Sequence, residues 1–406
     1  MKVPRLLKCL QKREAEVMKQ EGSDQGIHAP DNRICHLTRA CIHLDNLSHN
    51  MNLLQRLVGK LPLWPAIKAN AYGHGAEIIG RHLIKTGYST LCVAHIPEAI
   101  ELVEKGLNAR FIILSPTLPE YSAYVVNYGF EPVVCTLETI QSLSAAAAKA
   151  GRSVDVHLKV DTGMGRVGIR PEDVPAFLQQ SRAYPGVRIK GIMSHFPRAD
   201  EEDKVFSHRQ IQTFLHLKKA ADSYGIAFYH VANSAAIFDL PQAHLDAARP
   251  GISIYGLKPS HTIQNQAVHD LRPVLEWKTR IVFLKEVPTG TGLSYGHTYH
   301  TDRPSLIASI PLGYGDGMSR LLSNNLDVLV RGRRCPQVGR ICMDQCLVDV
   351  TDLRGDVKSG DEAVIIGSQG SETITADEIA GRLGTINYEI VTNISSRVPR
   401  IALEEG

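Results

Sequence analysis

Short apolar runs alternate with segments of helical periodicity between Leu63 and Leu271. The clearest helical patterns, with apolar residues three or four positions apart, cover 137–150 and 201–224. Each apolar run has the length of a buried strand. The predicted strands begin near Leu63, Thr90, Arg110, Pro132, Ser153, Val187, Ala227 and Leu245.

Eight strand–helix units in succession predict an α/β fold, an N-terminal (β/α)8 barrel of the TIM type. A doubly wound open sheet is the alternative. No Gly-x-Gly-x-x-Gly motif follows the first of these strands, which disfavours a dinucleotide-binding fold.

The pattern changes near Leu271, where short strand-like runs separated by Gly, Pro and Asp predict a mostly β C-terminal domain over 271–406. Its expected strands are 274–287, 306–312, 327–331, 345–350 and 363–366, with one helix at 375–383. We assign 33–270 to the barrel and expect its first strand, 37–44, to pair with the C-terminal domain. Residues 1–32 are polar and charged and are interpreted as a partly ordered extension.

Composition narrows the class of protein. Apolar residues make up 43% of the chain, and 45 Lys and Arg against 42 Asp and Glu give a formal net charge of +3. That balance argues against nucleic-acid binding, and no apolar run reaches transmembrane length. No secretory signal is visible. The 8 scattered cysteines indicate a reduced, cytoplasmic protein without a metal site.

One lysine stands out. Lys68 closes the apolar run that begins at Leu63, and the stretch from Ala66 reads Ala-Ile-Lys-Ala-Asn-Ala-Tyr-Gly-His-Gly. Near apolar walls the pKa of a lysine falls, and a neutral amine forms Schiff bases with carbonyls. The alternative is an amine that extends from the strand end into solvent. The stretch alone leaves both interpretations open.

This stretch resembles the pyridoxal 5'-phosphate (PLP) lysine motif of alanine racemases, and further motifs of that family recur in order from Leu37 to Leu403. The resemblance implies that Lys68 holds PLP as a Schiff base and that Tyr72 binds its phosphate. It also implies a racemase that interconverts L-alanine and D-alanine and supplies D-alanine for peptidoglycan.

Polar residues follow several of the predicted strands, where a barrel gathers its functional groups. Taken singly, they have ordinary explanations as a loop arginine, a core histidine or a helix cap. They are Arg166 in Asp-Thr-Gly-Met-Gly-Arg, His195 in Ser-His-Phe, the pair Asn233 and Ser234, and Arg249 with Gly251 and Ile252.

The resemblance gives these residues roles around PLP. Arg166 would lie between the phenolic oxygen and the substrate carboxylate, oriented by Lys159, which is carbamylated in some relatives. His195 would pack against the pyridine ring and bond Arg249. The phosphate would be held by Ser234 and by the backbone N–H groups of Gly251 and Ile252, and Asn233 would also bind the cofactor.

Arg249 would face the pyridine nitrogen. Arginine only donates hydrogen bonds, so the nitrogen would stay unprotonated and the ring would be a weaker electron sink. Racemisation would then be favoured over transamination.

Racemisation needs an acid or base on each face of Cα, and Lys68 serves one face. Gly292-Leu293-Ser294-Tyr295-Gly296 resembles the family's second-base motif, which implies that Tyr295 acts from the partner in a homodimer with a shared active site. Two further matches imply that Tyr314, Met343 and Asp344 contact the substrate region.

One position departs from the family: Ser396 stands where many members carry tyrosine, which we expect to widen the substrate pocket. A serine or broad-specificity racemase is therefore an alternative. A non-catalytic PLP-binding barrel is disfavoured by the β domain, and a decarboxylase by Arg249.

Overall fold

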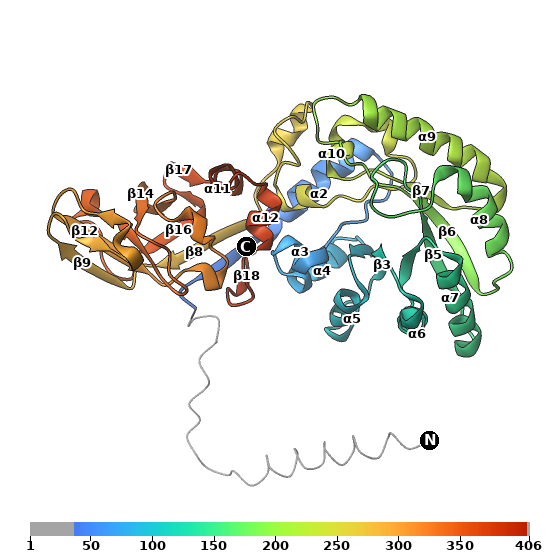
Figure 1. Ribbon diagram of the computed structural model, residues 1–406, viewed down its shortest axis with the longest axis horizontal. Coiled ribbons are helices and arrows are strands. Elements are labelled where there is room, and N and C mark those ends of the chain that lie inside the picture. The colour runs from blue at the N-terminus through green and yellow to red at the C-terminus, as the bar shows by residue number, and fades with distance from the viewer. Residues whose placement is uncertain (1–35, 404–406) are drawn as a thin grey trace, which may run out of the picture. The chain divides into compact units, whose positions relative to one another are not determined.

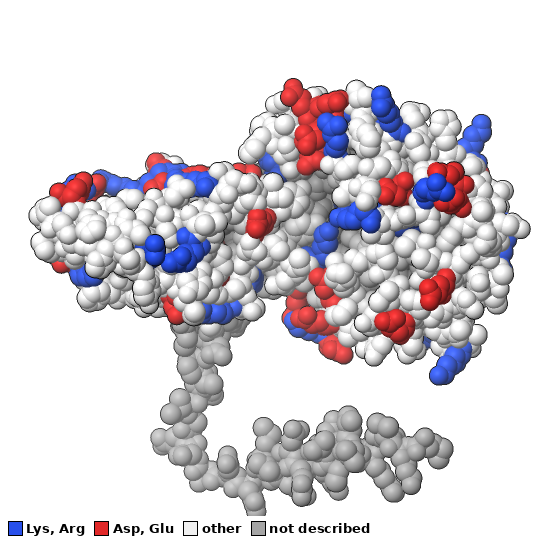
Figure 2. Space-filling model, viewed as in Figure 1, with Lys and Arg blue, Asp and Glu red and all other residues white. Residues whose placement is uncertain are grey.

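The computed structural model describes residues 36–403, so the extension predicted at 1–32 lies outside the described residues. Within residues 36–403, no helix is both long enough and apolar enough to cross a bilayer. On the face shown in Figure 2, basic and acidic side chains lie in small mixed clusters.

The first part is built on parallel strands. Strand order follows chain order from β2 to β7, with neighbours paired in parallel throughout. The strands are β2 (Thr90–Val93), β3 (Arg110–Pro116), β4 (Glu131–Val134), β5 (Val154–Lys159), β6 (Val187–Met193) and β7 (Phe228–His230).

Two short segments close this sheet into a barrel. Ala66 forms a parallel bridge with Cys92 of β2, and Leu63 forms one with Ala248. The segment that contains Ala248 in turn reaches β7, because the Arg249 amide donates to the carbonyl of Ala232. The predicted strands near Leu63 and Leu245 are therefore present as bridged segments, and the barrel prediction is confirmed.

Helices lie around the outside of these strands (Figure 1). Their buried faces carry the apolar positions of the sequence pattern, as in α7, which covers the predicted range. The helices are α2 (Leu44–Val58), α4 (Ala76–Lys85), α5 (Ile96–Glu104), α6 (Ser122–Tyr128), α7 (Leu137–Ala150), α8 (Val174–Ser181), α9 (Val205–Ala221) and α10 (Ser234–Asp239). The element labelled α3 (Lys68–Tyr72) is a left-handed turn.

The second part is mostly β. Its main sheet has the order β18-β1-β8-β16-β13-β14-β15-β12-β9, with β17 paired to β16 and a separate β10-β11 pair. The elements are β1 (Arg39–His43), β8 (Leu275–Arg280), β9 (Phe283–Val287), β10 (Gly292–Leu293), β11 (Tyr299–His300), β12 (Ser305–Ile310), β13 (Asp327–Val330), β14 (Arg333–Val338), β15 (Cys346–Asp349), β16 (Glu362–Gln369), β17 (Glu372–Ile374), α11 (Ala376–Leu383), α12 (Asn387–Thr392) and β18 (Arg400–Leu403).

The strand expected at 274–287 is two strands, because the chain turns after Arg280 and β9 pairs with β12 at the far edge of the same sheet. The N-terminal strand β1 lies in this same sheet, between β18 and β8. Strand β14 carries exposed Arg333 and Arg334 and a proline, so its apolar pattern is too weak to predict from sequence.

Candidate active site

Lys68 lies directly after the segment that closes the barrel, at the start of a left-handed turn. Ala69, Asn70, Ala71 and Tyr72 have φ values of 51°, 53°, 55° and 52°, a region that residues other than glycine seldom adopt. Glu98 stabilises the turn, since its carboxylate accepts from the Ala69 amide at 2.7 Å.

A cavity with a volume of about 380 Å³ opens beside this turn. The structure brings nine of the predicted site residues to its wall, where Lys159 also lies. The nine are Lys68, Tyr72, Arg166, His195, Asn233, Ser234, Arg249, Gly251 and Ile252.

One end of the cavity has the chemistry of an anion site. Tyr72 extends its hydroxyl toward Gly251, where an added Cβ would lie only 2.5 Å from the hydroxyl oxygen. Ser234 begins α10 and accepts from the Gly251 amide at 2.9 Å. Burial raises the pKa of Tyr72 above its ordinary value, so the hydroxyl remains a neutral donor. Hydroxyls and backbone N–H groups of this kind suit a phosphate.

Arg249 is buried at the end of the last barrel segment. Its Nη1 donates to Nδ1 and the carbonyl oxygen of His230, and its Nη2 donates to the carbonyl oxygens of Ser194 and Val231. A guanidinium has five N–H donors. Among the described residues, Nε–H has no acceptor, so this donor is left for a ligand in the cavity.

His195 lines the cavity but does not bond Arg249, which corrects the sequence expectation. The histidine partner of Arg249 is His230 at the end of β7, which sequence reasoning missed. Both histidines follow or end apolar strands, and the sequence does not tell which ring faces the arginine. Burial, together with the charges of Lys159 and Arg249, lowers the pKa of His195, which keeps it neutral.

The two lysines of the cavity are both shifted toward the neutral amine. Burial and the charge of Arg166 lower the pKa of Lys68. Burial and the charges of Arg249 and Arg166 lower the pKa of Lys159 to about 7. Neutral amines are nucleophiles and bases, so the cavity can carry out Schiff-base and proton-transfer chemistry.

The β-domain residues predicted for the site do not line this cavity. Tyr295, Tyr314 and Met343 are 70%, 43% and 52% exposed. Backbone hydrogen bonds connect their loops, from Tyr314 to the carbonyl of Cys342 and from Gly315 to that of Met343. Asp344 is also exposed and pairs with Arg397 at 2.8 Å.

Ser396 also lies outside the cavity wall and is exposed, in the turn that follows α12. The expectation that a serine here, in place of tyrosine, widens the substrate pocket stays a prediction. Tyr388 and Thr392 of α12 line the cavity instead. The Tyr388 ring lies 6.1 Å from the Tyr72 ring, centroid to centroid. The motif Asn-Tyr-Glu-Ile held this tyrosine, but nothing in the sequence marks it as facing the cavity.

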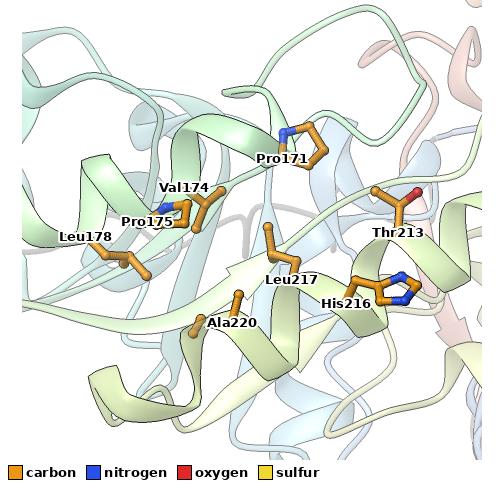
Figure 3. Close-up of a pocket in the computed structure, with 9 residues that line it drawn as sticks. Pro171, Val174, Pro175, Leu178, Thr213, His216, Leu217 and Ala220 are labelled. Atoms are coloured by element: carbon orange, nitrogen blue, oxygen red, sulfur yellow. The ribbon is translucent and has the colours of Figure 1, made fainter.

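Another hollow, of 320 Å³, lies between α8 and α9 on the outside of the barrel (Figure 3). Its wall is mostly apolar, with Val174, Leu178 and Leu217 facing His216 and Thr213, and it contains no residue of the predicted site. In the part of the chain that the structure describes, no three His, Cys, Asp or Glu side chains form a group that could hold a metal ion.

Known proteins match the chain over most of its length. Residues 42–259 match the family described as "Alanine racemase, N-terminal domain", and 274–402 match "Alanine racemase, C-terminal domain". The alanine racemase of Halothermothrix orenii is 46% identical over 371 residues, 91% of this chain and 97% of the relative.

Solved structures agree. An alanine racemase of Clostridium difficile 630 superimposes with a TM-score of 0.86 at 37% identity, covering 91% of this chain and 96% of that one. One from Bacillus anthracis, with bound L-Ala-P, gives 0.85 at 33% identity, covering 91% and 96%. The chain therefore belongs to the alanine racemase family and is an enzyme of that activity.

Proposed function

We propose that this racemase depends on PLP and works by two bases, Lys68 of one subunit and Tyr295 of its partner. The observation that carries the proposal is that one cavity contains three groups: the Lys68 amine with its lowered pKa, the anion site at Tyr72 and Gly251, and the unpaired Nε–H of Arg249.

The residues present fit PLP. Tyr72, Ser234 and the backbone of Gly251 and Ile252 would hold its phosphate. The Tyr72 hydroxyl lies so close to Gly251 that a Cβ on this residue would displace it, so the glycine leaves room for the hydroxyl at the phosphate site. The free Nε–H of Arg249 would donate to the pyridine nitrogen. When bound, PLP withdraws electrons from Cα of the amino acid and makes its proton removable.

Arg249 would determine where the proton returns. A guanidinium accepts no proton, so the nitrogen opposite it would remain unprotonated. The ring would then hold less charge, and the proton would return to Cα.

Lys68 would act on one face of Cα. Burial and the charge of Arg166 lower its pKa, which increases the share of neutral amine that can accept a proton. Arg166 borders the same cavity and would bind the substrate carboxylate.

The opposite face needs a second acid or base. Among the residues that line the cavity, Tyr72 and Tyr388 have pKa values raised by burial and suit hydrogen-bond donation better than proton removal. Tyr295 is exposed outside its own chain's cavity. These facts support a homodimer in which the partner subunit's Tyr295 completes each site.

We further propose that the enzyme works in the cytoplasm and supplies D-alanine for peptidoglycan. Its six described cysteines are free, as expected of a reducing compartment. Alanine is favoured over serine because the relatives that the chain matches are alanine racemases and the Tyr388 ring borders the cavity.

The test is formation of the D-enantiomer from L-alanine and, separately, from L-serine by protein loaded with PLP. D-alanine should form faster than D-serine. The Lys68→Ala variant should lose activity by about a thousandfold or more, whereas Lys85→Ala, an exposed lysine on α4, should retain it. Normal turnover by Lys68→Ala would refute the role of Lys68, and faster turnover of serine would refute the alanine preference.

A further inference from the structure

A line of hydrogen-bonded side chains runs from Arg249 through the inside of the barrel to its other end. Behind Arg249 lies His230 at the end of β7. His230 Nε2 is 2.9 Å from Nδ1 of His157 on β5. His157 Nε2 is 3.1 Å from Oε2 of Glu131 at the start of β4. His230, His157 and Glu131 are not among the residues that line the cavity.

The chemistry of the two ends fixes the direction of every hydrogen bond. Arg249 can only donate, so His230 accepts at Nδ1 and carries its proton on Nε2. His230 then donates to Nδ1 of His157, whose proton must also lie on Nε2. His157 donates in turn to Glu131, and an ionised carboxylate only accepts. The line therefore has a single orientation, from guanidinium to carboxylate.

The charge states agree with this orientation. Both histidines are fully buried, and burial lowers the pKa of each, so both rings are neutral. Burial alone would raise the pKa of Glu131. Hydrogen bonds from His157 and Lys190, with the charge of Arg110, instead lower it to about 2.

The surroundings keep the rings in place. Trp64 packs edge-on against both imidazoles, with ring centroids 5.8 Å from His157 and 4.9 Å from His230. Gly191 makes room for His157, because a Cβ there would lie 2.4 Å from Nδ1. Lys190 anchors Glu131 at 2.7 Å.

Arg249 has no carboxylate partner of its own among the described residues. We propose that Glu131 is a positioning residue: it fixes the proton of His157, which supports His230 from behind, and so holds the guanidinium of Arg249 with its Nε–H toward the cavity. Its catalytic consequence rests on the proposed function, in which that N–H meets the pyridine nitrogen of PLP.

The test compares Glu131→Gln with Asp155→Asn in the holoenzyme. Asp155 is a matched control, because it also binds Lys190, at 3.1 Å, and pairs with Arg188 but touches neither histidine. The first readout is the ¹⁵N shifts of the two imidazoles, assigned through His157→Gln and His230→Gln, which distinguish protonated from bare ring nitrogens. The second readout is kcat and KM for alanine.

In Glu131→Gln the His157 imidazole should populate both proton placements, because its Nε2–H loses the carboxylate that accepts it. The value of kcat should fall about tenfold with little change in KM. Asp155→Asn should change neither. Unchanged ring protons in Glu131→Gln, or equal effects of the two variants, would overturn the proposal. The ¹⁵N measurement does not need turnover. If the wild-type protein proves unable to racemise alanine, the proposed function is refuted, but altered ring protons in Glu131→Gln would still support the positioning role. If Glu131→Gln does not fold, Gly191→Ala, which displaces His157, should shift the His230 signals instead, and unchanged signals would again overturn the proposal.

Discussion

A mixed dimer can test whether two chains share each active site. Lys68 lines the cavity of its own chain, whereas Tyr295 is 70% exposed and lies outside that cavity. If the partner subunit's Tyr295 completes each site, a dimer of one Lys68→Ala chain and one Tyr295→Phe chain has one intact site and one site that lacks both groups. Its kcat per dimer should be about half of the wild-type value.

The two chains would be co-expressed with different affinity tags, purified over both tags, and assayed for D-alanine formation. Each homodimeric variant should be slower than wild type by about a thousandfold, so half activity would stand far above the background. The matched control is a dimer of one wild-type chain and one chain with both substitutions. Neither of its sites would contain both groups, so it should be inactive.

The pattern reverses if Tyr295 acts within its own chain. The control dimer would then keep one intact site and about half of the activity, and the mixed dimer would have none. That result would refute the shared site. Wild-type activity in homodimeric Tyr295→Phe would instead refute Tyr295 as the second base.

Three further results are expected. Gly251→Ala should weaken PLP affinity roughly tenfold to a hundredfold, because its Cβ displaces the Tyr72 hydroxyl and one charge-assisted hydrogen bond is lost. Fluorescence titration with PLP would measure this, with Gly381→Ala as the control because a Cβ there meets no neighbouring atom. Lys159 has a pKa lowered to about 7, so its amine becomes neutral and able to form a carbamate as the pH rises through 7. The carbamate signal from ¹³C-bicarbonate, measured by ¹³C NMR, should therefore increase over this range and be absent from Lys159→Ala. The pKa of Glu131 is depressed from 4.5 to about 2, so its contribution is complete above pH 4.5 and is lost as the pH falls toward 2. It amounts to at most about 3 kcal/mol, and urea unfolding of Glu131→Gln should show a weaker pH dependence in that window.

The barrel was predictable because each of its strands is a short apolar run followed by a helical pattern. Bridged segments at Leu63 and Ala248 take the place of two strands, since only isolated pairs connect there. The β domain was harder to predict. Strands β14 and β18 each have exposed residues, and the arginines that they carry hide the alternation.

The residues of the cavity were predictable where a motif directly follows the end of a predicted barrel strand. Which of several polar residues turns inward is a matter of packing, and there the sequence misled. Tyr388, and not Ser396, lines the cavity because α12 packs on the turn that follows Lys68, while Ser396 lies beyond that helix. His230 bonds Arg249 because the final barrel segment runs beside β7.

The left-handed turn explains why barrel and β domain both belong to the site. Four residues in this conformation cost about 4–8 kcal/mol, and neighbouring groups must offset that cost. From the barrel, Glu98 holds Ala69. From the β domain, Arg400 donates to the carbonyl of Gly73 at 2.8 Å, and Val391 packs so closely that a Cβ on Gly73 would lie 2.0 Å from its carbonyl oxygen. Without those contacts the turn would relax and take Lys68 and Tyr72 with it. The β domain therefore contributes to placing the amine of its own chain's cavity, in addition to presenting Tyr295 to a partner.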